Sequence, residues 1–145
     1  MGSEPRKVDL AVFPQADPSV VFGVFDTLWA AGRFWGQLMG GPPGEPLFEP
    51  RLVSSRAGPL ELISGATIHI PHAVGEIEPA DIVFLPNVIV FSPEELRSLD
   101  RTLLDWVAKM YAGGAHLYAA CGAPMALAQA GLLDGLEATT HWGTV

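Results

Sequence analysis

The sequence has one cysteine, Cys121, among its 145 residues, which excludes an internal disulfide framework and fits a reducing compartment such as the cytoplasm. Basic residues are also few, with 8 Lys and Arg against 16 Asp and Glu, for a formal net charge of −8. Because contacts to phosphates need a basic surface, this balance argues against direct nucleic-acid binding by the chain. No helix-turn-helix pattern and no set of zinc ligands is visible in the sequence.

Long apolar runs are absent too, and no segment approaches the length of a membrane-spanning helix. Residues 1–7 are polar and no apolar signal core follows them. We therefore expect a soluble cytoplasmic protein with no membrane partner. Hydrophobic residues make up 49% of the chain and charged residues 17%, which is typical of a folded domain with a real core.

Apolar segments of strand and helix character alternate along the whole chain. Strands are predicted over 8–13, 48–54, 82–85 and 116–120, helices over 20–31, 93–112 and 124–130, and a small hairpin over 60–63 and 67–70. This alternation predicts an α/β fold with a mostly parallel sheet in one domain. The helix over 20–31 is apolar all round, so we expect it to be buried on most sides or packed on a partner subunit.

Cys121 lies where the strand over 116–120 turns into a helix, with Pro124 at a first helical position. A side chain on such a turn is held at the top of a sheet, as in the nucleophile elbows of α/β enzymes. The alternative is a small buried hydrophobic residue. In open α/β sheets, sites form at the carboxyl ends of strands, which Pro14, Asn87 and Cys121 mark here.

The segment after the turn, CGAPMALAQAGLLDGLEATTHW over 121–142, resembles the DJ-1/PfpI superfamily. Within that superfamily, the segment is most similar to the form found in isonitrile hydratases and in the sensor domains of GlxA-type AraC-family regulators. Further agreement comes from 81–86, which is similar to the family pattern "aDlvivPG", and from single positions earlier in the chain: Pro14, Gly23, Asp26, Leu28 and Gly65.

The resemblance implies a flavodoxin-like three-layer α/β/α sandwich of the class I glutamine amidotransferase-like type. It also implies a homodimer, a reactive cysteine at Cys121, a small-molecule ligand and no cofactor. In catalytic members of the family a thiolate attacks an electrophilic carbon while a carboxylic acid handles the proton. Any helix-turn-helix of a regulator would have to lie outside these residues.

The catalytic acid of the hydratases is missing from its position. A gapless count from Pro14 to Asp26 places Val20 there, and valine cannot carry a proton. Asp17 would substitute only if the loop were rearranged. Asp26 matches a helix position for which a structural role is expected.

Two further departures flank the cysteine. Gly122 replaces the threonine of the hydratases and the histidine of the intracellular proteases, which removes a His–Cys pairing. Its backbone N–H is expected to remain available for stabilising an anion. Asn87 and Val88 replace glycines, which is expected to narrow the pocket or to add an amide as a recognition group.

The family domain continues past the His141-Trp142 signature with a strand and a closing helix. Residues 1–145 are therefore interpreted as a single domain truncated after that signature, whose sheet would expose an edge and an apolar face. The expected pocket is lined by Pro14, Val20, Asn87, Cys121 and Gly122, with His141 beside it as a general base or a structural hydrogen-bonding group.

Three functions remain open from the sequence. The favoured one is a small-molecule-sensing or interaction domain of a GlxA-type regulator, because Val20 removes a part that catalysis needs. The alternatives are a cysteine-dependent hydratase or hydrolase and a redox sensor that acts through Cys121. No metal site is predicted, because His69 and His72 have no evident third ligand.

Overall fold

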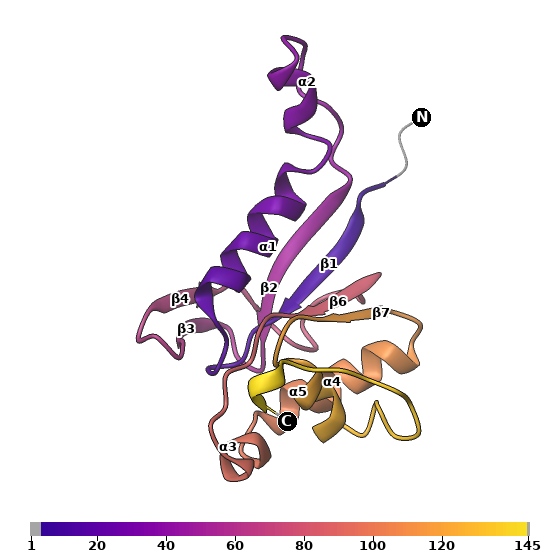
Figure 1. Ribbon diagram of the computed structural model, residues 1–145. Helices are drawn as coiled ribbons and strands as arrows, with labels where there is room; N and C mark the ends of the chain where they lie inside the picture. Colours follow the sequence, from indigo (N-terminus) through magenta and orange to yellow (C-terminus); the bar gives the residue numbers. More distant parts are fainter. Residues whose placement is uncertain (1–3, 145) are drawn as a thin grey trace.

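A five-stranded parallel sheet forms the centre of the computed structural model, which describes residues 4–144 (Figure 1). The strand order is β5-β2-β1-β6-β7, and every neighbouring pair runs parallel. The strands are β1 (Arg6–Ala11), β2 (Phe48–Ser54), β5 (His72–Ala73), β6 (Ile82–Leu85) and β7 (His116–Ala119). The order β2-β1-β6-β7 is that of flavodoxin-like folds and confirms the predicted α/β class.

Helices lie on both faces of this sheet. α1 (Pro18–Ala30) packs on one face, and α4 (Arg101–Ala112) and α5 (Pro124–Gln129) pack on the other (Figure 1). Side chains along β1 point alternately to the two faces of the sheet and so contribute to both hydrophobic cores. Val8 and Leu10 belong to the cluster under α1, whereas Ala11 and Phe13 belong to the cluster under α4 and α5. Side chains of this strand thus pack into both cores, which accounts for its continuous apolar run in the sequence.

One ion pair is buried within the sheet. Asp9 on β1 is 0% exposed and faces Arg51 on β2 in the strand register. Arg51 donates from Nε to Oδ1 of Asp9 at 2.6 Å and from Nη2 to Oδ2 at 3.0 Å. Burial raises the pKa of Asp9, and the hydrogen bonds and charge of Arg51 partly oppose that rise.

Several predicted elements are confirmed with their bounds. The strands over 48–54 and 82–85 match β2 and β6 residue for residue. The hairpin is also present, as the antiparallel pair β3 (Gly58–Glu61) and β4 (Thr67–Ile70). The first strand starts two residues before the predicted position. Three short elements were not predicted: α2 (Phe34–Leu38), β5 and the 3-10 helix η1 (Trp142–Thr144).

The single helix predicted over 93–112 is wrong, because two helices occupy that range. α3 (Pro93–Arg97) is capped by the Ser92 side chain, and α4 is capped by Asp100, whose Oδ1 accepts from the N–H of Leu103 at 3.2 Å. Between them the Ser98 hydroxyl donates to the carbonyl of Glu95 at 2.7 Å. Local side-chain bonds of this kind compete with the helix ladder, so a second N-cap divides the apolar stripe into two helices.

Of the two alternatives expected for the first helix, burial on most sides is wrong, and packing on a partner subunit stays a prediction. Within α1 Val21 is the buried residue, whereas Phe22 is 45% exposed and Trp29 43% exposed. Apolar side chains of the sheet beside this helix are accessible as well. A shallow groove of about 260 Å³ there is lined by Val8, Val24, Leu28, Phe48, Ile82, Phe84 and Tyr118. No helix within residues 4–144 has the length and apolar character that crossing a membrane requires.

Candidate functional site

The carboxyl ends of β1, β6 and β7 meet at one edge of the sheet, where the chain order reverses around β1. The loops after these strands are joined by backbone hydrogen bonds. Asp17 N donates to Asn87 O at 3.0 Å, Ile89 N to Gln15 O at 2.9 Å, and Ala120 N to Leu85 O at 3.0 Å. The carboxyl ends of parallel strands at such a reversal are where open α/β folds place their ligands.

Cys121 has the backbone geometry of an elbow. Its φ is +54°, and within residues 4–144 no other non-glycine residue has a positive φ. The left-handed conformation costs a residue with a Cβ about 1–2 kcal/mol, so the surrounding structure must impose it. The thiol is exposed, so the sharp turn presents it at the surface of the sheet edge.

Hydrogen bonds on both sides of Cys121 hold this conformation. Its carbonyl accepts from the backbone N–H of His141 at 3.2 Å and from the hydroxyl of Thr140 at 3.1 Å. On the helix side, the N–H of Ala123 donates to the carbonyl of Ala120 at 2.9 Å. The Thr140-His141 part of the C-terminal signature therefore positions the elbow through the backbone of the cysteine.

Replacing Cys121 with glycine is expected to leave the free energy of unfolding unchanged or to raise it by up to about 1 kcal/mol. Glycine adopts a positive φ without strain, and this gain offsets the larger entropy that glycine has in the unfolded chain. Urea unfolding of the wild type and the Cys121→Gly and Cys121→Val variants measures the effect, and valine should destabilise. A clear loss of stability in the glycine variant would show that the elbow is not strained.

The residue after the cysteine is packed too closely to carry a side chain. A Cβ added at Gly122 would lie 2.6 Å from the Val88 carbonyl oxygen and 3.2 Å from Oδ1 of Asn87. In the structure that Oδ1 accepts the N–H of Gly122 at 3.0 Å. The Val88 carbonyl, and to a lesser degree the carboxamide of Asn87, thus fills the space that a side chain after the cysteine would need.

This contact corrects one expectation and connects two of the departures from the family pattern. The N–H of Gly122 is not available to an anion, because Asn87 already accepts it. The two departures at positions 87 and 122 are therefore in direct contact through this hydrogen bond. Sequence reasoning treated them separately because the contact spans 35 residues of chain.

Asp17 does not serve as a substitute acid in this geometry. It is the N-cap of α1, where its Oδ1 accepts from the Ser19 N–H at 2.9 Å and from the Ser19 hydroxyl at 2.7 Å. The Ser19 hydroxyl is the main cause that lowers the pKa of Asp17, and the Asn87 amide and backbone N–H groups lower it further. A carboxyl group held in its ionised form has no proton to donate at neutral pH.

The lowered pKa of Asp17 predicts that its contribution to the free energy of unfolding depends on pH. Its folded pKa lies below its unfolded value, so its contribution is present above the unfolded pKa and is lost as pH falls through the folded pKa. Asp17→Ala should cost about 0.5–2 kcal/mol at neutral pH and less in acid, whereas Asp17→Asn should keep most of the cap. Urea unfolding from neutral to acid pH measures both; an equal loss for Ala and Asn would contradict the capping role.

The other residues of the expected pocket belong to different surroundings, although His141 also contacts Cys121 through its backbone N–H. Val20 is on α1 and lines a shallow depression with Gly23, Val24, Thr27 and Leu28. Pro14 lines a cavity at the end of β2. The His141 ring stacks against Trp142, with centroids 5.2 Å apart, and its Nδ1 accepts from the Gly143 N–H at 3.1 Å. Whether Pro14, Val20 and His141 bind a ligand with Cys121 stays a prediction.

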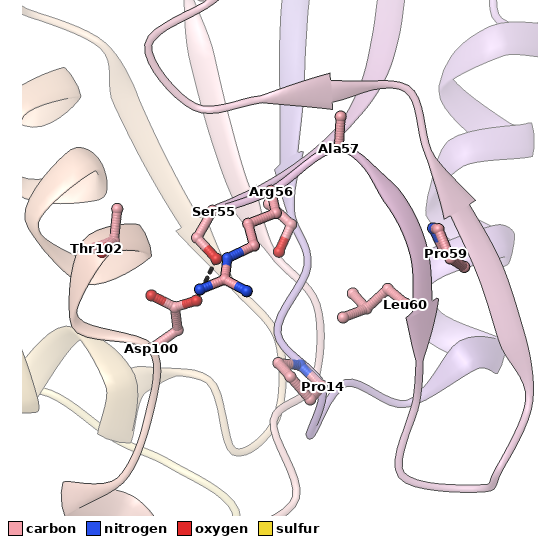
Figure 2. A pocket seen from close by; sticks show the side chains of 9 residues that line it. Pro14, Ser55, Arg56, Ala57, Pro59, Leu60, Asp100 and Thr102 are labelled. Atoms are coloured by element: carbon pink, nitrogen blue, oxygen red, sulfur yellow. Dashed lines mark hydrogen bonds between the residues drawn. The ribbon is translucent and has the colours of Figure 1, made fainter.

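Sequence reasoning missed the cavity at the carboxyl end of β2. It has a volume of about 450 Å³ and is lined by Pro14, Ser54, Ser55, Arg56, Ala57, Pro59, Leu60, Asp100 and Thr102 (Figure 2). The signal that could have found it is the polar run Ser54-Ser55-Arg56 at a strand's carboxyl end. No cluster of three or more metal-ligating side chains occurs within residues 4–144.

Comparison with solved structures agrees with this architecture. The ThiJ/PfpI family protein from Pseudomonas syringae superposes with a TM-score of 0.70 at 20% identity, over 98% of this chain and 52% of that one. The AraC family transcriptional regulator from Pseudomonas putida gives a TM-score of 0.64 at 16% identity, over 97% of this chain and 69% of that one. At these identities the likeness concerns the fold.

Sequence comparison is more specific. The HTH-type transcriptional regulator CdhR of Pseudomonas aeruginosa (strain PAO1) is 29% identical over 99 residues, which are 68% of this chain and 28% of that protein. The chain thus spans about a quarter of the regulator's length and about half that of the P. syringae protein. The model of the DJ-1/PfpI family matches residues 47–145, well over half of the sequence. The chain belongs to the DJ-1/PfpI family.

Proposed function

We propose that this domain is the small-molecule-sensing or interaction domain of a GlxA-type transcriptional regulator and that it does not perform cysteine-dependent hydration. The observation that carries the proposal is the hydrogen bond from Gly122 N to Asn87 Oδ1 at 3.0 Å. Asn87 thereby engages the N–H of the residue after Cys121, while Cys121 retains the backbone conformation of an elbow. The similarity to a helix-turn-helix regulator supports the regulatory part of the proposal.

Cysteine-dependent hydration needs more than a positioned thiol. The attack requires a thiolate, a donor for the charge that develops on the substrate, and an acid that delivers a proton. Here the neighbouring N–H is engaged, Asp17 caps a helix, and Val20 has no proton to give. Ligand binding needs only a shaped crevice, so the loss of these partners affects catalysis more than sensing.

The assembly is part of the same proposal. We place a homodimer contact on α1, whose exposed Phe22 and Trp29 give it an apolar outer face. DNA binding is assigned to a segment outside these residues, because the net charge of −8 disfavours phosphate contacts. The compartment is the cytoplasm, as expected for a regulator.

One observation favours a second function. Cys121 keeps a strained φ and an exposed thiol, which is the state that a nucleophile or a redox-sensing cysteine needs. A cysteine-dependent hydratase or hydrolase, or a redox sensor, therefore remains the alternative, and turnover that depends on Cys121 would decide for the enzyme.

A thermal-shift screen of small polar metabolites against the protein tests the sensing function. A ligand that binds only the folded state raises the free energy of unfolding by about 2.7 kcal/mol when its concentration is a hundred times Kd. The melting temperature therefore rises with the ligand concentration. We expect at least one compound to produce a saturable shift that is unchanged in Cys121→Ser. A screen in which only thiol-reactive compounds act, and only with Cys121 present, would contradict the proposal.

A further inference from the structure

We propose that the cavity at the carboxyl end of β2 binds small organic carboxylates, with Arg56 as the residue that recognises the carboxylate. The proposal rests on the sensing function above and gives it a ligand class and a place apart from the thiol. The cavity volume of about 450 Å³ falls within the range of small-molecule sites, toward its lower end.

The cavity has walls from four parts of the fold. Its lining comes from the β1–α1 loop through Pro14, from the segment after β2 through Ser55 and Arg56, from β3 through Leu60, and from the start of α4 through Asp100 (Figure 2). Sites of this kind between strand ends and a helix start are held by rigid elements on several sides. Ligand binding here would therefore affect the β1–α1 loop, which also contacts Asn87 near the elbow.

Arg56 is the cationic residue of this lining and has no protein partner. The ion pairs of the described residues involve other arginines and lysines, and no hydrogen bond within residues 4–144 uses the Arg56 guanidinium. Figure 2 shows that guanidinium on the cavity side, in front of Ser55 and Asp100. A planar guanidinium binds a carboxylate through two parallel hydrogen bonds, so this group is suited to a carboxylate ligand.

The nearby carboxylate of Asp100 is already engaged. One of its oxygens accepts the Ser55 hydroxyl, and the other accepts the N–H of Leu103 as the N-cap of α4. The N-terminal end of a helix dipole further offsets its charge. Asp100 therefore repels an incoming anion less than a free carboxylate would, and it can accept from an ammonium group if the ligand carries one.

The remaining lining selects for a short apolar chain on the ligand. The apolar residues of the lining are Pro14, Ala57, Pro59 and Leu60, and Figure 2 shows Pro14 and Leu60 across from Ser55 and Asp100. The shared chemistry is a carboxylate attached to a few carbon atoms. Both a simple monocarboxylate and an α-amino acid carry it, and the two sources differ in the ammonium group that Asp100 would receive.

Calorimetric titration at low salt tests the proposal, with pentanoate, norvaline and the neutral analogue pentanamide as probes. We expect pentanoate or norvaline to bind and pentanamide to bind at least about tenfold more weakly, because a charge-assisted pair is lost. Binding of norvaline alone assigns the ligand to α-amino acids, and binding of both assigns it to carboxylates in general. Equal binding of pentanamide, or no binding by either acid, overturns the proposal.

Variants separate this site from the elbow. Arg56→Gln should weaken binding of the acid by about tenfold or more, whereas Arg97→Gln, which changes another exposed arginine on α3, should leave the affinity unchanged. Cys121→Ser and Asn87→Ala should leave it unchanged as well. Loss of binding in the elbow variants with normal binding in Arg56→Gln would move the ligand to the elbow, which refutes this site and keeps the sensing function. If the thermal-shift screen finds a ligand that saturates but no carboxylate binds, this site is refuted as well and the sensing function stands.

Discussion

Arg51→Leu is expected to lower the free energy of unfolding by about 3–5 kcal/mol at neutral pH. Its partner Asp9 is 0% exposed, and two hydrogen bonds from Arg51 satisfy its carboxylate. Removing the guanidinium leaves a buried charge without a counter-ion, and the remaining burial raises the pKa of Asp9. Urea unfolding monitored by circular dichroism measures the loss.

The pH dependence of that loss provides a second readout. In the wild type the folded pKa of Asp9 is already raised, so its contribution is present below the unfolded pKa and is lost as pH rises through the folded pKa. Without Arg51 this effect grows, so the deficit of Arg51→Leu should shrink as the solution is acidified. A deficit that does not depend on pH would mean that lost packing, and not the buried charge, causes it.

Two further variants serve as controls. Arg97→Leu breaks an exposed pair with Glu94 in which the side chains are 60% and 74% exposed, and it should change stability by less than about 0.5 kcal/mol. Asp9→Val combined with Arg51→Leu should regain much of the loss, because an apolar pair leaves no uncompensated charge. A double variant as unstable as Arg51→Leu alone would contradict the interpretation.

Gly122→Ala is expected to destabilise the protein by about 1–3 kcal/mol, whereas Gly23→Ala should stabilise it by up to about 1 kcal/mol. The same methyl group is added in both variants. At Gly122 it would lie 2.6 Å from the backbone oxygen of Val88, and at Gly23, inside α1, it meets no atom within 4 Å. Thermal or urea unfolding of the two variants side by side compares these effects.

The stability that Gly122→Ala loses should depend on the residue at position 87. Asn87→Ala removes the side-chain oxygen 3.2 Å from the added methyl group and leaves the Val88 carbonyl in place. The combined variant should therefore lose less stability than the sum of the two single variants, with a coupling of about 0.5 kcal/mol or more. Strict additivity would show that the two positions do not share the crevice.

The parts of the fold that could be predicted from the sequence are those with local, periodic signals. β6 has the predicted bounds because its four apolar residues lie between Asp81 and Pro86, which leaves few alternatives. The division between α3 and α4 was missed because the apolar stripe continues across it, while the side chain of Asp100 ends the continuity. The exposure of α1 was missed because periodicity does not report what covers an apolar face.

The candidate site shows the same limit. The position of Cys121 at an elbow followed from the strand-to-helix pattern and the family signature, and its positive φ agrees with that position. The engagement of the Gly122 N–H by Asn87 could not be predicted, because it depends on how loops after two different strands meet. The Arg56 cavity likewise depends on four separate segments that only the tertiary structure brings together.

The central feature of the site is an elbow that positions Cys121 while the neighbouring N–H of Gly122 is bonded to Asn87. Together they separate the position of the cysteine from its chemistry, because a thiol can be well placed while the groups that assist its attack serve structural bonds.

The most direct test is turnover of an alkyl isonitrile, with the N-alkyl formamide product followed by nuclear magnetic resonance. Hydration adds one water to the isonitrile carbon, so product and consumed substrate should balance. We predict that the wild type and Cys121→Ser give the same rate as buffer alone. Formamide production by the wild type that disappears in Cys121→Ser would contradict the account and assign the protein to the enzymes of its family.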